Sequence, residues 1–203
     1  MLMMKFCIKN QAILAKIKMT LENNIIRHYL RNAYFITGTA YAGKSTMVKM
    51  LAEKYDMIFC GENYTSDISD KIAGFEIAEL IRLSGTAPDK KIIVDTNMPL
   101  DLLKEISDYN HIAVMLSPQS MSVERFFDRT DPEKQYILSV INSCENPEQV
   151  MENYREGLAL INSKKHYDEF ANAGLFTLIR EDDGRDTKDE VLEKMAEHFG
   201  LKN

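Results

Sequence analysis

Eight consecutive residues at positions 38–45 have the types and spacing needed to hold a phosphate group. They read Gly-Thr-Ala-Tyr-Ala-Gly-Lys-Ser and fit the pattern G-x-x-x-x-G-K-[ST]. The two glycines permit backbone angles and a close approach that a Cβ would block, so successive N–H groups can point inward at an anion. Lys44 can then reach the β- and γ-phosphates of a nucleotide, and the Ser45 hydroxyl can take one position on Mg²⁺.

The segments on either side of this loop are those that the pattern requires. Residues 33–37 form a short apolar run typical of a strand, and residues 46–51 have helical spacing. The positive end of the helix dipole would add to the attraction for phosphate. The alternative, a chance match on an ordinary turn, does not demand this order of strand, loop and helix. We therefore predict a nucleotide site formed by Gly38, Thr39, Ala40, Tyr41, Ala42, Gly43, Lys44, Ser45 and Thr46.

Short apolar runs alternate with helical stretches along the rest of the chain. The predicted strands lie at residues 33–37, 57–60, 91–95, 112–116 and 175–179. Their apolar residues are continuous, as in parallel strands that are covered on both faces. Between residues 118 and 173 we expect two or three helices and no strand, with Pro147 opening a long helix. Strands that alternate with helices predict a doubly wound, five-stranded parallel α/β sheet.

Two expectations concern the ends of the chain. Residues 10–31 are predicted to form an amphipathic helix, and we place a boundary between this segment (1–32) and the main domain (33–203). Its apolar stripe consists of Leu14, Ile17, Leu21, Ile25 and His28. We favour packing of this stripe, His28 included, against the domain over a dimer or partner helix. Thr187 and Glu190 have the spacing of a capping box for a last helix.

Composition restricts the class of protein. The chain has 203 residues, of which 45% are hydrophobic and 28% charged, and its net charge is −6. These values are typical of one soluble globular domain, and we expect no signal peptide and no membrane span. Residues 1–60 carry nine Lys and Arg against three Asp and Glu. The acidic whole argues against a broad nucleic-acid surface, although not against binding of a single polynucleotide 5′ end.

The three cysteines favour a reducing compartment. Cys7, Cys60 and Cys144 are odd in number, far apart and lack C-x-x-C spacing. A disulfide framework or a zinc site is therefore not expected, and we predict free thiols in a cytoplasmic protein.

The order of elements and the phosphate-loop pattern resemble the P-loop small-molecule kinases, which include nucleoside monophosphate, shikimate and gluconate kinases and polynucleotide 5′-kinases. The resemblance covers residues 33–200 in element order, but only the loop is a specific motif. It implies the strand order 2-3-1-4-5, a helical lid region, and ATP and Mg²⁺ as cofactors. In that order Asp95 would lie beside Ser45, where it can hold a metal-bound water or accept the proton of the attacking hydroxyl. The alternative is a carboxylate that only caps a strand end.

Further roles follow from the same resemblance. Asp95, Thr96 and Asn97 resemble a D-T-N run of polynucleotide-kinase-like members. A basic lid is expected after the fourth strand, where Arg125 and Arg129 are four residues apart on one predicted helical face. The two guanidinium groups would stabilise charge on the γ-phosphate, although a solvated helix with surface ion pairs is the alternative.

The acceptor and base sites are implied in the same way. Glu62 or Asp67 would bind or deprotonate the acceptor hydroxyl after the second strand, unless both are solvated loop residues. Arg185 lies where the family holds the base of ATP. Two departures from the family remain: Tyr41 replaces a glycine that is frequent there, and no nucleoside-monophosphate signature follows Met57.

The sequence thus predicts an ATP- and Mg²⁺-dependent kinase that transfers the γ-phosphoryl group to a hydroxyl of a small molecule. The residues expected to carry catalysis are Lys44, Asp95, Arg125, Arg129 and Glu62, with Ser45 and Asp95 at the metal. The alternative is a nucleotide-binding regulatory or interaction module without phosphoryl transfer. The identity of the acceptor, the choice between ATP and GTP, and the oligomeric state are left open.

Overall fold

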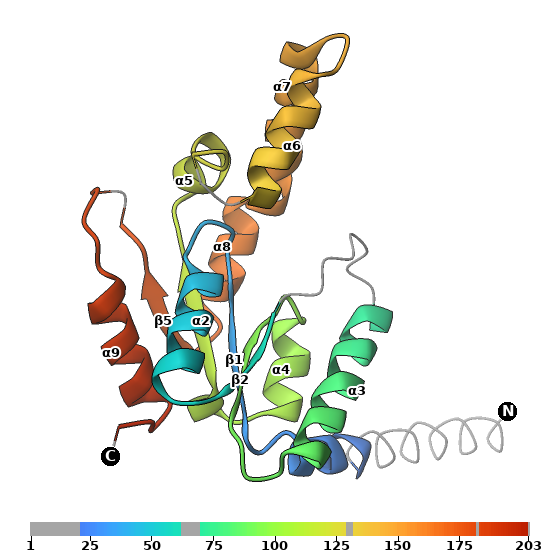
Figure 1. Ribbon diagram of the computed structural model, residues 1–203, viewed down its shortest axis with the longest axis vertical. Coiled ribbons are helices and arrows are strands. Elements are labelled where there is room, and N and C mark those ends of the chain that lie inside the picture. Colours follow the sequence, from blue (N-terminus) through green and yellow to red (C-terminus); the bar gives the residue numbers. More distant parts are fainter. Residues whose placement is uncertain (1–20, 62–69, 129–131, 182, 203) are drawn as a thin grey trace, which may run out of the picture.

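The computed structural model describes residues 21–61, 70–128, 132–181 and 183–202 (Figure 1). The strands are β1 (Ala33–Gly38), β2 (Ile58–Cys60), β3 (Ile92–Asp95), β4 (Ile112–Leu116) and β5 (Phe176–Ile179). The helices are α2 (Lys44–Lys54), α3 (Asp70–Thr86), α4 (Leu100–Ile106), α5 (Gln119–Glu124), α6 (Pro132–Asn142), α7 (Pro147–Ile161), α8 (Lys164–Ala171) and α9 (Lys188–His198). A 3-10 turn, η1 (Tyr109–His111), precedes β4, and residues 21–29 form a further helix before β1.

The five strands form one parallel sheet in the order β2-β3-β1-β4-β5. This arrangement confirms the predicted doubly wound sheet, and each strand lies within a residue of its predicted bounds. The register pairs Ile36 with Asp95 and Gly38 with Met115. The carboxyl ends of β1, β3 and β4 therefore meet at one edge of the sheet, where ligands of such folds bind.

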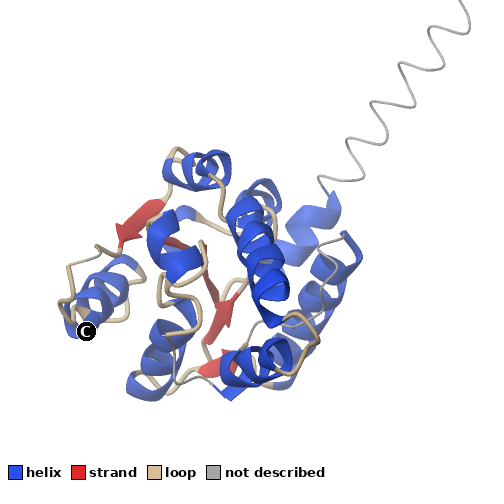
Figure 2. Ribbon diagram, turned by 90° about the horizontal axis from the view of Figure 1, so that it is seen from above, coloured by secondary structure: helices blue, strands red, loops and turns tan. Residues whose placement is uncertain are grey.

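Helices cover both faces of the sheet, as Figure 2 shows from above. Alternate side chains of β1 point to opposite faces, so Tyr34 and Ile36 pack with α2 and α9, whereas Ala33 and Phe35 pack with α3 and α4. Phe170 of α8 packs against Val114 and Leu116 of β4 in a third, smaller cluster. Burial of each large apolar side chain contributes about 1.5–3 kcal/mol before entropy is counted, so these two cores hold the strand ends in place.

The segment between β4 and β5 contains four helices in the described residues, more than the two or three predicted. The pair α6 and α7, which we call the helical arm (residues 132–161), extends away from the sheet in Figure 1. Helix α7 begins at Pro147 as predicted, with the Asn146 side chain accepting a hydrogen bond from the Gln149 amide at 3.3 Å. We expect from the sequence that this helix continues to Gly174, but it ends at Ile161, because the Ser163 side chain caps the start of α8 by accepting from the His166 amide.

The predicted capping box of the last helix does not form. Thr187 is the N-cap of α9, but its side chain makes no capping hydrogen bond. The Lys188 amide donates instead to Oδ1 of Asp186 at 3.2 Å. The neighbouring carboxylate thus satisfies one amide of the first turn of α9, but a different one from the Glu190 amide that the Thr187 hydroxyl of a capping box would bind.

The helix before β1 contacts the domain through a different face from the one predicted. Leu21 and Ile25 are 59% and 58% exposed, and His28 is exposed as well, so packing of this stripe is wrong for these residues. Leu14 and Ile17 lie outside the described residues. The contact is made instead by Ile26, which lies about 100° around the helix axis from Ile25, and by the buried Leu30, which directly follows the helix.

A polar anchor determines this orientation. The Arg27 side chain donates hydrogen bonds to the carbonyl oxygens of Glu105 at 2.7 Å and Ser107 at 2.8 Å, at the end of α4. Because these bonds hold Arg27 toward the domain, the neighbouring Ile26 packs against the domain, and the predicted stripe of Leu21 and Ile25 faces outward. None of the helices in the described part of the chain is both long and apolar enough to cross a bilayer.

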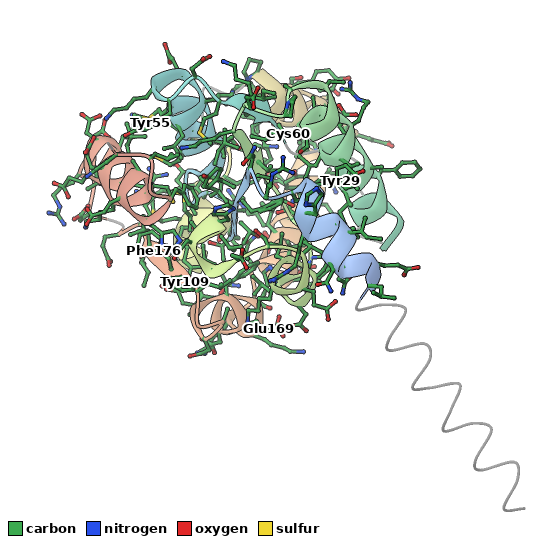
Figure 3. All side chains as sticks on the ribbon, turned by 90° about the horizontal axis from the view of Figure 1, so that it is seen from below. Tyr29, Tyr55, Cys60, Tyr109, Glu169 and Phe176 are labelled. Atoms are coloured by element: carbon green, nitrogen blue, oxygen red, sulfur yellow. The ribbon has the colours of Figure 1, made fainter. Side chains whose placement is uncertain are left out.

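Aromatic rings pack together at the amino ends of β4 and β5, on the side of the sheet opposite to the phosphate loop. The His198 ring stacks on Phe176 with centroids 4.1 Å apart, and Tyr109 meets it edge-on at 5.3 Å. Figure 3 views this side of the molecule and labels Tyr109 and Phe176. Burial lowers the pKa of His198, which keeps the ring neutral and suited to stacking at pH 7. These contacts give His198 a structural role.

Candidate functional site

The phosphate loop leaves the end of β1 through backbone angles that few residues adopt. Gly38 and Gly43 have φ angles of 130° and 92°, and Tyr41 has a φ of 65°. The Thr39 amide donates to the carbonyl oxygen of Met115 at 3.1 Å, which ties the loop to β4. A Cβ on Gly38 would lie 1.9 Å from that oxygen. Glycine is therefore required at position 38 by close packing as well as by its φ angle.

This close approach leads to a stability prediction. Gly38→Ala is expected to lower the free energy of unfolding by about 3 kcal/mol or more, because β1 and β4 must separate to admit the methyl group. Thermal denaturation followed by circular dichroism should show a melting temperature lower by about 6–12 °C.

A second glycine serves as the control for this prediction. Gly157 lies inside α7, and a Cβ there would meet nothing within 4 Å. Gly157→Ala should therefore stabilise the protein by about 0.5–1 kcal/mol. If the Gly38→Ala protein has the same melting temperature as the unmodified chain, β1 and β4 do not approach as closely at Gly38 and Met115 as described.

The start of α2 presents uncapped backbone amides and the Lys44 ammonium group to the loop. Gly43 is the N-cap residue of α2 and provides no side-chain cap for the first amides of the helix. The Lys44 ammonium group folds back over the loop and donates to the carbonyl oxygens of Gly38 and Thr39, each at 3.3 Å. An uncapped helix N-terminus together with an ammonium group is a suitable site for a phosphate.

A carboxylate lies beside this cationic loop. Asp95 ends β3 and is 1% exposed, and its Oδ2 accepts a hydrogen bond of 2.5 Å from the Ser45 hydroxyl. The sheet register produces this contact, because β3 pairs directly with β1 and the Thr96 amide donates to the Ile36 carbonyl oxygen. The other carboxylate oxygen, Oδ1, is buried and has no hydrogen-bond partner among the described residues.

The Ser45 and Asp95 oxygens meet a requirement of magnesium binding. Mg²⁺ prefers hard oxygen ligands and is commonly held by one or two protein oxygens together with phosphate and water. An unpartnered buried carboxylate oxygen is costly unless something binds it. The residues present therefore fit a magnesium ion, which the Ser45 and Asp95 oxygens would hold.

The first half of the loop is fixed by side chains that sequence reasoning missed. The Ser117 amide donates to the Thr39 hydroxyl at 2.8 Å, and the Ser117 hydroxyl donates to the Ala40 carbonyl oxygen at 2.6 Å. The Ala40 amide donates to Oδ1 of Asn162 at 3.1 Å. Ser117 follows β4 directly, so its place after a predicted strand was a usable signal. The position of Asn162 after α7 gave no such signal.

Arg180 is a further residue at the loop that the sequence did not single out. Its guanidinium group lies over the Tyr41 ring, 5.0 Å from the centroid, and donates to the Tyr41 carbonyl oxygen at 2.9 Å. Arg180 directly follows β5, which places it at the same sheet edge as Asp95. The ring at position 41 therefore packs with this arginine, and a glycine there would lose the contact.

Arg185, the predicted contact to the base of ATP, lies on the exposed segment before α9. It forms an ion pair with Asp183, and the hydrogen bond between the two raises the pKa of the arginine. Its own amide also donates to the Asp183 carboxylate at 3.1 Å. The role of Arg185 at the base stays a prediction.

The predicted arginine lid has a different local structure from that expected. Helix α5 ends at Glu124, and Arg125 is its C-cap residue, so Arg125 lies just after the helix and not within it. The helix stops because Phe126, which is 6% exposed, turns inward to pack against Tyr154 of α7. Arg129, Glu62 and Asp67 lie outside the described residues, and their predicted roles remain predictions together with that of Arg125.

Cys60 marks the end of β2, next to the segment in which an acceptor site is predicted. Burial of its thiol, and next the negative charges of Glu76 and Glu79 on α3, raise its pKa to about 11. Glu76 is itself 6% exposed. The environment at this end of β2 therefore disfavours anions, in contrast to the cationic phosphate loop.

The raised pKa predicts slow alkylation of Cys60. In a Cys7→Ser, Cys144→Ser protein, the rate of reaction with iodoacetamide should rise about tenfold per pH unit from pH 8 to pH 10, because only the thiolate reacts. The same protein unfolded in urea is the control and should level off above about pH 8.5. A plateau near pH 9 in the folded protein would contradict the raised pKa.

The strand order, the G-x-x-x-x-G-K-S loop between β1 and α2, and the carboxylate at the end of β3 define a P-loop fold of the kinase-like type. No protein-family model matches the sequence, and no curated protein matches it.

Solved structures with a similar course of the chain were found. They include shikimate kinase from Bacteroides thetaiotaomicron, at 14% identity over 83% of this chain and 98% of that chain, with a TM-score of 0.48. The YorR protein from Bacillus subtilis, in complex with phosphorylated GDP, is similar at 15% identity over 83% and 96%, with a TM-score of 0.46. Shikimate kinase from Acinetobacter baumannii, in complex with shikimate, is 18% identical over 84% and 94%, with a TM-score of 0.42. Likenesses this distant assign no substrate and no activity to this chain.

Proposed function

We propose that this protein is an ATP- and Mg²⁺-dependent kinase that transfers the γ-phosphoryl group to a hydroxyl of a small molecule. One observation carries the proposal. The buried Asp95 carboxylate accepts a 2.5 Å hydrogen bond from Ser45, at the start of an uncapped helix that follows a phosphate-loop pattern. A loop that only bound phosphate would gain nothing from a buried negative charge there, unless a metal ion or a proton were handled beside it.

In this proposal the residues of the loop bind and orient the triphosphate. The first amides of α2 and the Lys44 ammonium group neutralise phosphate oxygens, and Arg180 adds a positive charge beside Tyr41. Magnesium, held through Ser45 and Asp95, would supply further neutralisation of the β- and γ-phosphates. Catalysis would then depend mainly on positioning and charge, as is general for phosphoryl transfer.

The chemical step moves one phosphoryl group. A bond forms between the acceptor oxygen and the γ-phosphorus, the bond between that phosphorus and the β–γ bridging oxygen breaks, and ADP leaves. The proton of the acceptor hydroxyl passes to a carboxylate, for which Asp95 and Glu62 are the candidates. Arg125 and Arg129 would stabilise the transferred group. Cys60 and Cys144 are free thiols, which suits a cytoplasmic enzyme working on cellular ATP.

The direct test is acceptor-dependent ADP release. Calorimetry should first show that the folded protein binds Mg·ATP. A panel of sugars, nucleosides, small hydroxy acids and 5′-hydroxyl oligonucleotides should then be assayed for ADP formed in proportion to a phosphorylated product. A polynucleotide acceptor is disfavoured by the net charge of −6, so signal from the oligonucleotides alone would redirect the substrate class.

A regulatory nucleotide-binding module is the second candidate. Exposed apolar residues at the base of the helical arm, in the last turn of α7, favour it, since Leu160 and Ile161 are 79% and 60% exposed. Such residues could contact a partner protein. Binding of Mg·ATP without transfer to any acceptor would support this candidate over the kinase.

A further inference from the structure

The backbone of Ala40 is held on both sides of its Cα, at the N–H of one peptide unit and the C=O of the next, by groups that are distant in sequence. Its amide donates to Oδ1 of Asn162 at 3.1 Å, and its carbonyl oxygen accepts from the Ser117 hydroxyl at 2.6 Å. Ser117 follows β4, whereas Asn162 follows α7 of the helical arm. The third residue of the phosphate loop is therefore fixed jointly by the sheet edge and by the base of the arm.

The Asn162 side chain connects the phosphate loop to the last turn of α7. It is 4% exposed, and its Nδ2 donates to the Leu158 carbonyl oxygen at 2.9 Å, while its own amide donates to the same oxygen. Each polar atom of the side chain thus has one defined partner, which fixes the orientation of the amide group. Because a single rigid group joins the last turn of α7 to the loop, neither can move without straining the other.

We propose that Asn162 is a positioning residue that holds the phosphate loop ready for nucleotide and couples nucleotide binding to the helical arm. This inference rests on the proposed nucleotide site. Without Asn162 the partly buried Ala40 amide would lose its partner in the protein, and the loop would relax to satisfy it. Relaxation would turn away the following amides, so affinity would fall. Coupling is reciprocal, so bound nucleotide must also stabilise the last turn of α7.

The chain offers a matched control at the end of the next helix. Asn172 is the C-cap residue of α8, and its φ of −96° is close to the −101° of Asn162. Its Nδ2 also donates to the carbonyl oxygen four residues earlier, that of Asp168, at 2.8 Å. The Asn172 side chain is exposed and makes no hydrogen bond to the loop. Asn162→Ala and Asn172→Ala therefore remove the same helix cap, but only the first removes the link.

Titration calorimetry with Mg·ATP distinguishes the two variants. We expect Asn162→Ala to raise the Kd by about tenfold, because the hydrogen bond that orients the partly buried Ala40 amide is lost. Asn172→Ala should change the Kd by less than about twofold, since a cap remote from the loop affects folding alone. Asn162→Ala should also lower the melting temperature more than Asn172→Ala, because Asn162 is buried and makes the additional hydrogen bond to Ala40.

Hydrogen exchange adds a readout that a purely structural role would not change. In the unmodified chain Mg·ATP should slow amide exchange over residues 158–162, and this effect should vanish in Asn162→Ala. Equal Kd values for the two variants, or no change in exchange over residues 158–162 on Mg·ATP binding, would overturn the inference while leaving the kinase proposal intact. The exchange measurement on the unmodified chain still decides if Asn162→Ala does not fold. No uptake of Mg·ATP by the unmodified chain would overturn both the nucleotide site and the coupling.

Discussion

Lys44→Ala is expected to lower kcat for phosphoryl transfer by about 10²–10³-fold, the range found when one preorganised donor is removed from a site of developing charge. The Lys44 ammonium group already lies over the loop, 3.3 Å from the carbonyl oxygens of Gly38 and Thr39. A bound triphosphate would offer it a far stronger partner than these neutral oxygens. The loss should therefore appear in kcat and in the affinity for ATP, measured by coupled ADP release and calorimetry.

The fold should survive this substitution. The two hydrogen bonds of the ammonium group are long and partly exposed, so their loss should cost less than about 1 kcal/mol of unfolding free energy. Lys49→Ala is the matched control, because Lys49 is an exposed lysine later in the same helix. It should leave turnover within about twofold of the unmodified protein. Unchanged turnover in Lys44→Ala would reject the loop as the site of phosphoryl transfer.

Asp95→Asn is expected to separate activity from stability. Turnover should fall by about 10²–10⁴-fold, because the amide cannot act as a base and its oxygen is a weaker hydrogen-bond acceptor for a metal-bound water. Stability should stay within about 1 kcal/mol of the unmodified chain, since the amide oxygen can still accept from Ser45 and a buried charge is removed. Raising the Mg²⁺ concentration should restore part of the activity if the carboxylate serves the metal.

The control for Asp95 is a carboxylate on the next helix. Asp101 lies exposed in the first turn of α4, and Asp101→Asn should leave turnover within about twofold of the unmodified protein. The competing view is that Asp95 only caps the end of β3. That view predicts normal turnover and lower stability in Asp95→Asn, the reverse of the result expected here.

The sequence could predict the local features of the fold because they depend on near neighbours. Continuous apolar runs indicated the five strands, and Pro147 indicated the start of α7. The pattern from Gly38 to Ser45 indicated the loop, since its glycines meet a conformational need that few other residues can meet. The predictions that failed include a surface contact, the stripe of Leu21 and Ile25, where Arg27 decides the orientation, and a local one, the capping box at Thr187.

Only the tertiary structure decided which distant residues meet at the loop. Ser117, Asn162 and Arg180 contact it through hydrogen bonds across 77 to 139 positions of the chain. No local pattern encodes such contacts, because they depend on how α7 and β5 pack against the sheet edge. The sequence by itself determined a strand, a phosphate loop and a helix, through steric limits on the backbone. Packing of the sheet determined what surrounds that loop, through the register that brings Asp95 to Ser45.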